Sequence, residues 1–337
     1  MAGKVLVTGG SGYIAGFIIR QLIAEGWTVN TTIRNLARES EVRGWLDVDN
    51  DRLAFFAADL MDDAGWAEAV AGCSHVAHVA SPLPSNAPKS DDELIIPATQ
   101  GALRALRFAR DAGVSRVVMT SSVAAISYGH KGKTRFTEAD WTDVDSPDAY
   151  AYVKSKTIAE RAARDWMARE GGALEFCTVN PSLVLGPLFT ADFSTSLEAI
   201  KKLLEGSMPG IPRLGFGVVD VRDVADMHVK LLTMAGMNGE RFIASGPFIW
   251  MADIARILRD TLGNDARKVP TRKLPDFIVK IAARFDPVLR QVTGEIGNVR
   301  ENDASHAKAV LGWETRAVEQ SIVDTARDMI RLGVVKI

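Results

Sequence analysis

A glycine-rich stretch close to the start of the chain constrains the fold more than any other feature. A short apolar run at residues 4–8 is followed by Gly9, Gly10, Ser11 and Gly12, and then by apolar residues at helical spacing. This order predicts a strand, a tight turn and a helix. Glycines accept positive φ and let the backbone approach a ligand, and the first turn of a helix offers unpaired N–H groups to an anion. The stretch therefore predicts a cradle for the pyrophosphate of a dinucleotide.

Size and composition are those of a globular α/β enzyme. The chain has 337 residues, 47% of them hydrophobic and 24% charged, and a net charge of -2 without a block of like charges. These values argue against a nucleic-acid or membrane partner. No apolar run is long enough to span a bilayer, and a strand starting at Lys4 leaves no room for a signal peptide, so we expect a cytoplasmic protein. Cys73 and Cys177 are expected to be reduced core residues.

The end of the second strand indicates which dinucleotide is bound. Residues 28–33 form a β-like run that is followed by Arg34. An acidic residue at this point would accept the 2′-hydroxyl of NAD, whereas a guanidinium suits the 2′-phosphate of NADP. Arg38 follows one helical turn later and is interpreted as a solvated loop residue. The sequence therefore favours NADP over NAD.

Further strands are predicted at residues 53–58, 74–80, 115–120 and 174–180, alternating with helices. In an open parallel sheet, ligands bind outside the carboxyl ends of the strands, so Asp59, Ala80 and Ser81 are candidates for cofactor contacts. Ser121 and Ser122 lie at such an end, either as reactive groups or as a serine-rich turn. His75 and His78 are three apart on a strand and face opposite ways, so no metal site is expected.

A helix predicted from about residue 148 to 169 carries two Tyr/Lys pairs. Tyrosine and lysine four apart share one face of a helix, and the ammonium lowers the cost of ionising the phenol. Tyr150 with Lys154 and Tyr152 with Lys156 both fit this spacing. Periodicity does not choose between the pairs, and either could be an ordinary surface pair.

The second half of the chain is less regular. Residues 1–180 are expected to form the dinucleotide-binding domain, with residues 215–245 returning to it, and residues 181–337 to form most of a substrate domain. Residues 181–187 are predicted to be a structured loop, residues 241–245 a short strand, and residues 318–332 an amphipathic helix. Phe189, Phe193 and Phe216 are interpreted as pocket lining that suits a bulky apolar or aromatic substrate, with core packing as the alternative.

The chain resembles the extended short-chain dehydrogenase/reductase family. The motifs that carry the resemblance run through nearly the whole chain and occur in the family's order; they lie at residues 8–15, 59–60, 120–122, 152–156, 180–187 and 311–313. Arg34, Ala15 and residues 78–82 and 152–160 are similar to the branch that contains dihydroflavonol reductase, cinnamoyl-CoA reductase and yeast-type methylglyoxal or aldehyde reductases.

The resemblance implies a doubly wound parallel (Rossmann) sheet with a smaller, mainly helical C-terminal substrate domain. It implies NADPH-dependent reduction of a ketone or aldehyde, by a monomer or homodimer. The family places a serine directly before the lysine, which selects Tyr152 and Lys156, with Ser122 as the third catalytic residue. The implied cofactor-binding residues are Gly9, Gly12, Tyr13, Ile14, Arg34, Asp59, Leu60, Ala80, Ser81, Tyr152, Lys156, Pro181 and Val184.

One departure from the family pattern concerns the helix after the fourth strand. Many members have an asparagine near its start, where this chain has Ile96, Pro97, Ala98, Thr99 and Gln100. A proton relay through that asparagine is therefore not carried over to this chain.

Two other functions share the same scaffold. A sugar-nucleotide epimerase or dehydratase has the Tyr/Lys pair but retains its cofactor and usually prefers NAD, which Arg34 disfavours. A non-catalytic dinucleotide sensor often lacks the tyrosine and lysine, and this chain has both. Hydrolysis by a Ser-His-Asp triad is excluded because no Gly-x-Ser-x-Gly elbow occurs.

Overall fold

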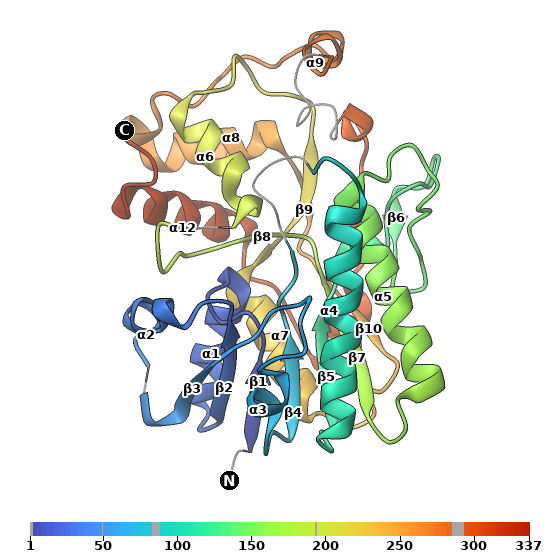
Figure 1. Cartoon of the computed structure of the whole chain (residues 1–337). Coiled ribbons are helices and arrows are strands. Elements are labelled where there is room, and N and C mark those ends of the chain that lie inside the picture. Colours follow the sequence, from blue (N-terminus) through green and yellow to red (C-terminus); the bar gives the residue numbers. More distant parts are fainter. Residues whose placement is uncertain (1–2, 49, 83–87, 193, 285–292) are drawn as a thin grey trace.

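The main element of the fold is a seven-stranded parallel sheet (Figure 1). The computed structural model describes residues 3–48, 50–82, 88–192, 194–284 and 293–337. The strand order is β10-β7-β5-β4-β1-β2-β3, and each neighbouring pair is parallel. The strands are β1 (Lys4–Val7), β2 (Thr28–Ile33), β3 (Leu53–Ala57), β4 (His75–His78), β5 (Arg116–Thr120), β7 (Glu175–Pro181) and β10 (Arg241–Ala244). The chain reverses its direction of winding between β1 and β4, so their carboxyl ends form the expected ligand crevice.

Helices cover both faces of this sheet, which confirms the predicted doubly wound fold. One core layer joins α1 and α7 to the sheet, and the other joins α3, α4 and α5 to its opposite face. Cys177 is buried in the first layer and Cys73 in the second, and both are free thiols. The helices are α1 (Tyr13–Ala24), α2 (Glu39–Leu46), α3 (Trp66–Val70), α4 (Asp92–Asp111), α5 (Ala151–Glu170) and α7 (Val221–Thr233).

A second lobe has a hydrophobic core of its own. It contains α6 (Glu198–Glu205), α8 (Met251–Leu262) and α12 (Val318–Arg331), which lie above the sheet in Figure 1. Their apolar faces meet through fully buried side chains such as Leu203, Ile254 and Ile322. A three-stranded sheet in the order β11-β9-β8 accompanies them, with β8 (Leu183–Leu185), β9 (Gly215–Asp220) and β11 (Phe248–Trp250).

This second sheet corrects one prediction. Residues 181–187 are not simply a loop, because β8 lies within them and pairs in parallel with β9. A strand of three residues is too short to show a periodicity in the sequence. Within residues 215–245, β9 belongs to the second sheet, whereas α7 packs on the first sheet and β10 is its edge strand.

The C-terminal third also supplies small elements that reach the first domain. These are α11 (Ser305–Leu311), which packs on the main core, and β12 (Glu301–Asn302), which pairs with β6 (Arg135–Phe136). In contrast, α9 (Asp276–Ala282) lies at the far end of the molecule in Figure 1. The β12 pairing brings residues near 300 beside the segment that follows β5. The C-terminal part of the chain therefore borders both lobes.

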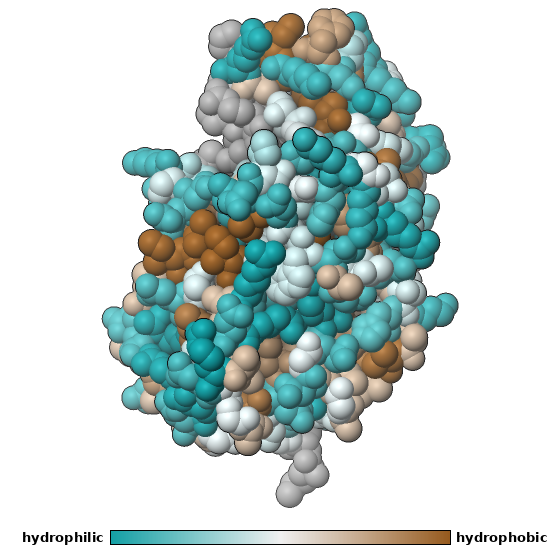
Figure 2. Space-filling model, turned by 90° about the vertical axis from the view of Figure 1, so that its right-hand side faces the viewer, coloured by the Kyte–Doolittle hydropathy of each residue, from teal (hydrophilic) through white to brown (hydrophobic). Residues whose placement is uncertain are grey.

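The surface is mostly hydrophilic on the side shown in Figure 2, with a broad apolar patch at mid-height on the left and a smaller one at the top end, where α9 lies. Phe277 and Ile281 of α9 are 63% and 52% exposed. No helix in the described ranges combines the length and apolar character needed to cross a membrane.

Candidate active site

The glycine-rich turn lies between β1 and α1, at the carboxyl edge of the main sheet. Gly9 has φ of +75°, and a Cβ there would come within 3.1 Å of the Ala80 backbone. Gly12 is the N-cap of α1, and no side chain caps this end of the helix. The N–H groups of the first turn are therefore not taken by a capping side chain, and the turn is shaped for close approach. These features fit the phosphates of a dinucleotide.

The two arginines after β2 have different surroundings. Arg34 is exposed directly after the end of β2. The Arg38 guanidinium donates to Glu41 and to Asp192, at 2.8 and 3.0 Å. Arg38 is thus engaged by carboxylates, while Arg34 stands at the point of the sheet edge where a dinucleotide's adenosine ribose would lie.

Asp59 and Leu60 follow the end of β3, as predicted. The Asp59 carboxylate accepts a hydrogen bond from the Met61 N–H at 2.8 Å, and its carbonyl accepts one from Trp66 Nε1 at 2.9 Å. Leu60 packs so closely on α4 that a Cβ at Gly101 would lie 2.6 Å from Leu60 Cδ2. The loop is therefore fixed next to the sheet edge.

Ser122, Tyr152 and Lys156 come together from two elements. Ser122 caps a short 3-10 turn after β5, where its Oγ accepts from Ala124 N at 3.1 Å. Tyr152 and Lys156 lie one turn apart on α5, with Lys156 Nζ 6.0 Å from the centre of the Tyr152 ring. A side-chain hydrogen bond links Tyr152 to Ser122. The sequence-predicted trio is thus one cluster at the carboxyl edge.

The other residues implied by the resemblance border this cluster. Lys156 Nζ donates to Ser81 Oγ at 3.0 Å, directly after Ala80 at the end of β4. Ser122 Oγ donates to the Pro181 carbonyl at 3.4 Å, at the end of β7. Val184 is buried in β8, three residues further on. Ser81 and Pro181 therefore lie in direct contact with the cluster, at the ends of neighbouring strands.

Burial controls the acidity of this cluster. Burial raises the pKa of Tyr152, and the hydrogen bond to Ser122 only partly opposes it. Burial also lowers the pKa of Lys156 to about 8, against the attraction of Glu160. We expected the ammonium to ease ionisation of the phenol, but its Nζ is directed to Ser81 and the loss of hydration dominates. The raised pKa means that the Tyr152 phenol keeps its proton at neutral pH.

The surroundings of the two lysines separate the Tyr/Lys pairs that periodicity left open. Lys154 Nζ forms a partly exposed ion pair with Asp91 at 2.8 Å. Lys156 is only 9% exposed and faces the ends of the strands. Tyr152 and Lys156 are thus the pair at the sheet edge.

A buried carboxylate below this cluster was not anticipated from the sequence. Glu160, one turn after Lys156 on α5, accepts from Ser121 Oγ at 2.6 Å, Asn180 Nδ2 at 2.9 Å and Arg241 Nε at 2.7 Å. Burial raises its pKa, but Arg241 and Arg164 outweigh this effect and lower it overall. Glu160 therefore remains charged and ties α5 to β5, β7 and β10. The available signal was its spacing of four from Lys156 on the same helix.

Phe189, one of the three phenylalanines interpreted as pocket lining, packs against other aromatic rings. Its ring stacks on Phe17 of α1 at 4.2 Å and on Trp45 of α2 at 5.4 Å. Phe216 packs against the core of the second lobe, and Phe193 lies outside the described residues. For Phe189 these contacts favour the alternative of core packing, which the sequence could not separate from pocket lining because a loop phenylalanine looks the same in both.

His75 and His78 serve the fold. His78 is buried and its Nδ1 bonds to Thr8 Oγ1 at 3.0 Å, while Nδ1 of the half-buried His75 bonds to the neighbouring Ser74. Burial lowers the pKa of His78 to about 3. Among the described residues, no three metal-ligating side chains converge.

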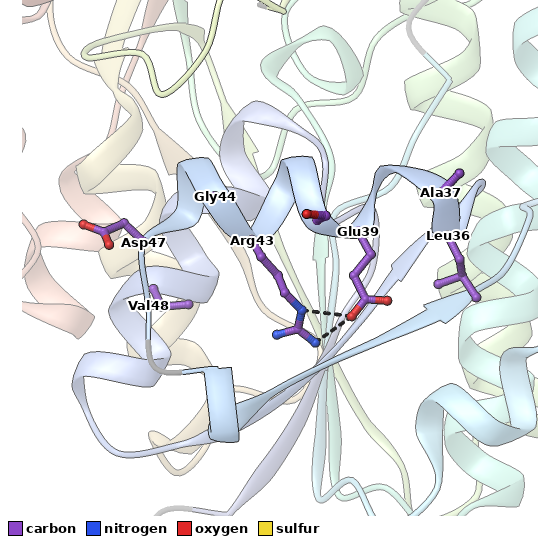
Figure 3. A pocket seen from close by; sticks show the side chains of 8 residues that line it. Leu36, Ala37, Glu39, Arg43, Gly44, Asp47 and Val48 are labelled. Atoms are coloured by element: carbon purple, nitrogen blue, oxygen red, sulfur yellow. Dashed lines mark hydrogen bonds and ion pairs between the residues drawn. The ribbon is translucent and has the colours of Figure 1, made fainter.

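A separate hollow of ≈ 650 Å³ lies along α2 (Figure 3). It is lined by Leu36, Ala37, Glu39, Ser40, Arg43, Gly44, Asp47 and Val48. Two of these residues, Glu39 and Arg43, form an ion pair with each other at 2.8 Å (Figure 3). Ser122, Tyr152 and Lys156 are not among the residues that line this hollow. We therefore place the candidate active site at the sheet edge.

The fold and the glycine turn together define a dinucleotide-binding protein of the Rossmann class. The chain belongs to the NAD dependent epimerase/dehydratase family, whose pattern matches residues 5–244. This confirms the family resemblance seen in the sequence.

Three relatives illustrate the range of this family. A cinnamoyl-CoA reductase of Medicago truncatula is 35% identical over 268 residues, which cover 77% of this chain and 81% of that protein. A dihydroflavonol 4-reductase of Hordeum vulgare is 31% identical over 295 residues, covering 85% and 80%. The yeast methylglyoxal/isovaleraldehyde reductase, solved with NADPH, superposes with a TM-score of 0.83 at 25% identity over 98% and 99% of the two chains. The chain thus belongs to a family of enzymes, and these three relatives are reductases.

Proposed function

We propose that this protein reduces a ketone or aldehyde to an alcohol with NADPH. The observation that carries the proposal is the cluster of Ser122, Tyr152 and Lys156 at the sheet edge, beside a glycine turn that a side chain would block. The reductase relatives, one of them solved with NADPH, support it. When bound, NADPH supplies the hydride that the carbonyl carbon accepts.

The cofactor residues follow the order of the strand ends. Gly9, Gly12, Tyr13 and Ile14 would hold the pyrophosphate, and Arg34 the 2′-phosphate. Asp59 and Leu60 would border the adenosine, and Ala80, Ser81, Lys156, Pro181 and Val184 the nicotinamide half. Most of the substrate side would come from residues 181–337.

Each of the three catalytic residues has one task. Ser122 donates a hydrogen bond to the carbonyl oxygen and stabilises the charge that develops there. Tyr152, neutral and buried, gives its proton to the nascent alkoxide as general acid. Lys156, whose Nζ donates to Ser81, would lower the cost of the resulting phenolate and would hold the ribose of the nicotinamide half.

The test is loss of NADPH absorbance with a panel of aryl ketones, α-keto esters, short aldehydes and a dihydroflavonol, with NADH in parallel. Turnover with NADPH preferred is the expected result. No turnover with either cofactor, together with a nucleotide retained through purification, would favour a sugar-nucleotide epimerase or a dinucleotide sensor.

The role of Arg34 has its own test. In Arg34→Ser, kcat/KM for NADPH should fall roughly 10- to 100-fold, because charge-assisted hydrogen bonds to the 2′-phosphate are lost. The value for NADH should change little. Arg38→Ser is the matched control, and its smaller effect is expected because Glu41 and Asp192 already engage Arg38. An equal loss with both cofactors in Arg34→Ser would remove the assignment.

A further inference from the structure

Ser122 lies just beyond the point where the backbone ladder between β5 and β7 ends. The last bond of this ladder runs from the Ser121 N–H to the Val179 carbonyl at 2.7 Å. Because the bonds of a parallel ladder are evenly spaced, the next one would need an N–H at residue 181. Pro181 has no N–H, so the ladder stops there. The peptide of the catalytic serine therefore depends on another partner for its position.

The side chain of Asn180 supplies the donor that the backbone lacks. Its Nδ2 donates to the Ser122 carbonyl at 3.1 Å. Pro181, the next residue of β7, accepts from Ser122 Oγ through its own carbonyl at 3.4 Å. Two consecutive residues thus hold the two polar ends of Ser122, since Asn180 bonds to its carbonyl and Pro181 to its hydroxyl.

The amide of Asn180 is itself held in one orientation. Its Nδ2 also donates to Glu160 Oε2 at 2.9 Å, and its Oδ1 accepts from Thr178 Oγ1 at 3.0 Å. A flipped amide would place Oδ1 against the Ser122 carbonyl and the Glu160 carboxylate, which both only accept. Asn180, Glu160 and Thr178 are completely buried, so water does not replace a bond that is lost among them. The donor is therefore fixed on Ser122.

Glu160 connects this amide to the other side of the catalytic serine. Ser121 Oγ donates to the Glu160 carboxylate at 2.6 Å. Glu160 thus holds the residue before Ser122 directly and Ser122 itself through Asn180. A donor that stabilises developing charge must lie about 2.7–3.1 Å from the oxygen, so a small displacement of the Ser122 hydroxyl weakens its effect.

We propose that Asn180 is a positioning residue for the reduction, which sets the place of the Ser122 hydroxyl and touches neither substrate nor cofactor. This inference rests on the proposed reductase activity, in which Ser122 donates to the carbonyl oxygen. The effect of Asn180 on turnover therefore passes through Ser122. Loss of the Asn180 donor lowers kcat more than it raises KM, because the bond it weakens is strongest in the transition state.

A double-mutant cycle tests this coupling, with NADPH and ethyl benzoylformate as the substrates. Ser122→Ala alone should lower kcat roughly 10²- to 10³-fold. Asn180→Ala alone should lower it roughly 10- to 100-fold, because the hydroxyl is misplaced and not removed. In the Ser122→Ala background, Asn180→Ala should lower kcat less than about twofold, since no hydroxyl is left to position. Asn180→Asp keeps the shape of the side chain but loses the donor, and should give the same pattern.

Thr178→Val is the matched control. It removes the hydroxyl that bonds to Asn180 Oδ1 and Glu160 Oε1, but it leaves the Asn180 donor on Ser122. We expect this variant to lose stability in urea while its kcat stays within about threefold of wild type. The Kd for NADPH, measured by fluorescence, checks that each variant is folded, and Asn180→Asp carries the cycle if Asn180→Ala does not fold.

The outcomes separate this inference from the activity on which it rests. An unchanged kcat in Asn180→Ala, or equal losses with and without the Ser122 hydroxyl, would overturn the inference and leave the reductase proposal intact. A loss in Thr178→Val as large as that in Asn180→Ala would also overturn it, because the whole network would then matter only for folding. If the wild-type protein oxidised NADPH with no carbonyl, the proposed function would fail, and this inference with it.

Discussion

The edge of the seven-stranded sheet and the seam between the two lobes are built in different ways. At the edge, parallel strands end side by side, so residues far apart in the chain are brought together by regular topology. At the seam, the segment after β8 contacts α12 through the Leu188 N–H, which donates to Asp328, and contacts α1 and α2 through the ring of Phe189. Candidate catalytic side chains thus come together where the strands of a regular sheet end, whereas irregular segments determine how the two lobes pack against each other.

The largest expected effect is at the sheet edge. Tyr152→Phe removes the proton donor without changing the ring, so kcat should fall roughly 10²- to 10⁴-fold. NADPH binding, followed by fluorescence, should remain within about threefold of wild type because the phenol adds little to cofactor affinity. Turnover retained in this variant would mean that Tyr152 is not the general acid. The sheet edge would then be no more sensitive to substitution than the seam.

The buried carboxylate under the edge should matter for folding. Glu160→Gln leaves Arg241 and Arg164 without their charge partner, and we expect the free energy of unfolding to fall by about 3 kcal/mol. Urea denaturation measures the change. The matched control is Glu170→Gln near the exposed end of the same helix, whose pair with Arg110 should cost below about 1 kcal/mol. Equal losses in the two variants would mean that the buried network does not stabilise the edge.

The pH dependence follows from Lys156, whose pKa burial lowers to about 8. The value of kcat/KM for NADPH reports the free enzyme, so it should fall about tenfold per pH unit above pH 8 as the ammonium is lost. Because the unfolded lysine keeps its proton to about pH 10.4, burial costs stability below pH 8 and this cost is relieved as the pH rises from 8 towards 10.4.

The assignment of this titration to Lys156 can be checked by substitution. Lys156→Met removes the titrating ammonium, so the rise in the free energy of unfolding between pH 8 and 10.4 should disappear. An activity profile that stayed flat up to pH 10 in the wild-type protein would contradict the assignment of Lys156.

The smallest expected effect is at the seam. Phe189→Ala removes stacking on Phe17 and Trp45 from a half-buried position, and should cost about 2 kcal/mol of stability with KM for aryl ketones unchanged. Asp192→Asn, which weakens an exposed pair with Arg38, should cost below about 1 kcal/mol. Thermal denaturation and saturation kinetics measure both. A raised KM with unchanged stability in Phe189→Ala would return this residue to the substrate pocket.

The sequence predicts the strands of the main sheet and the residues at their ends, because alternation and glycine-bounded turns are local signals. It does not choose between Tyr150 and Tyr152, since both pairs have the same spacing. What separates them is the partner of each lysine, Asp91 for Lys154 and Ser81 for Lys156, and these partners lie 63 and 75 residues away in the chain.

Other features of the site are equally invisible to periodicity. The bonds of Glu160 come from β5, β7 and β10, and a single glutamate on a helix gives no sign of being buried. In the second sheet, β8 and β11 have three residues each, which is too short to show a pattern. Phe189 joins two lobes whose contact depends on the whole fold.

The most direct test of the central claim uses NADPH deuterated at C4 of the nicotinamide, with ethyl benzoylformate as the acceptor. Hydride transfer at the Ser122, Tyr152 and Lys156 cluster predicts one equivalent of deuterium on the carbinol carbon of the product, with one NADP⁺ formed per alcohol. An alcohol without deuterium, or NADPH left unoxidised while a nucleotide sugar is isomerised, would contradict the assignment of a carbonyl reductase.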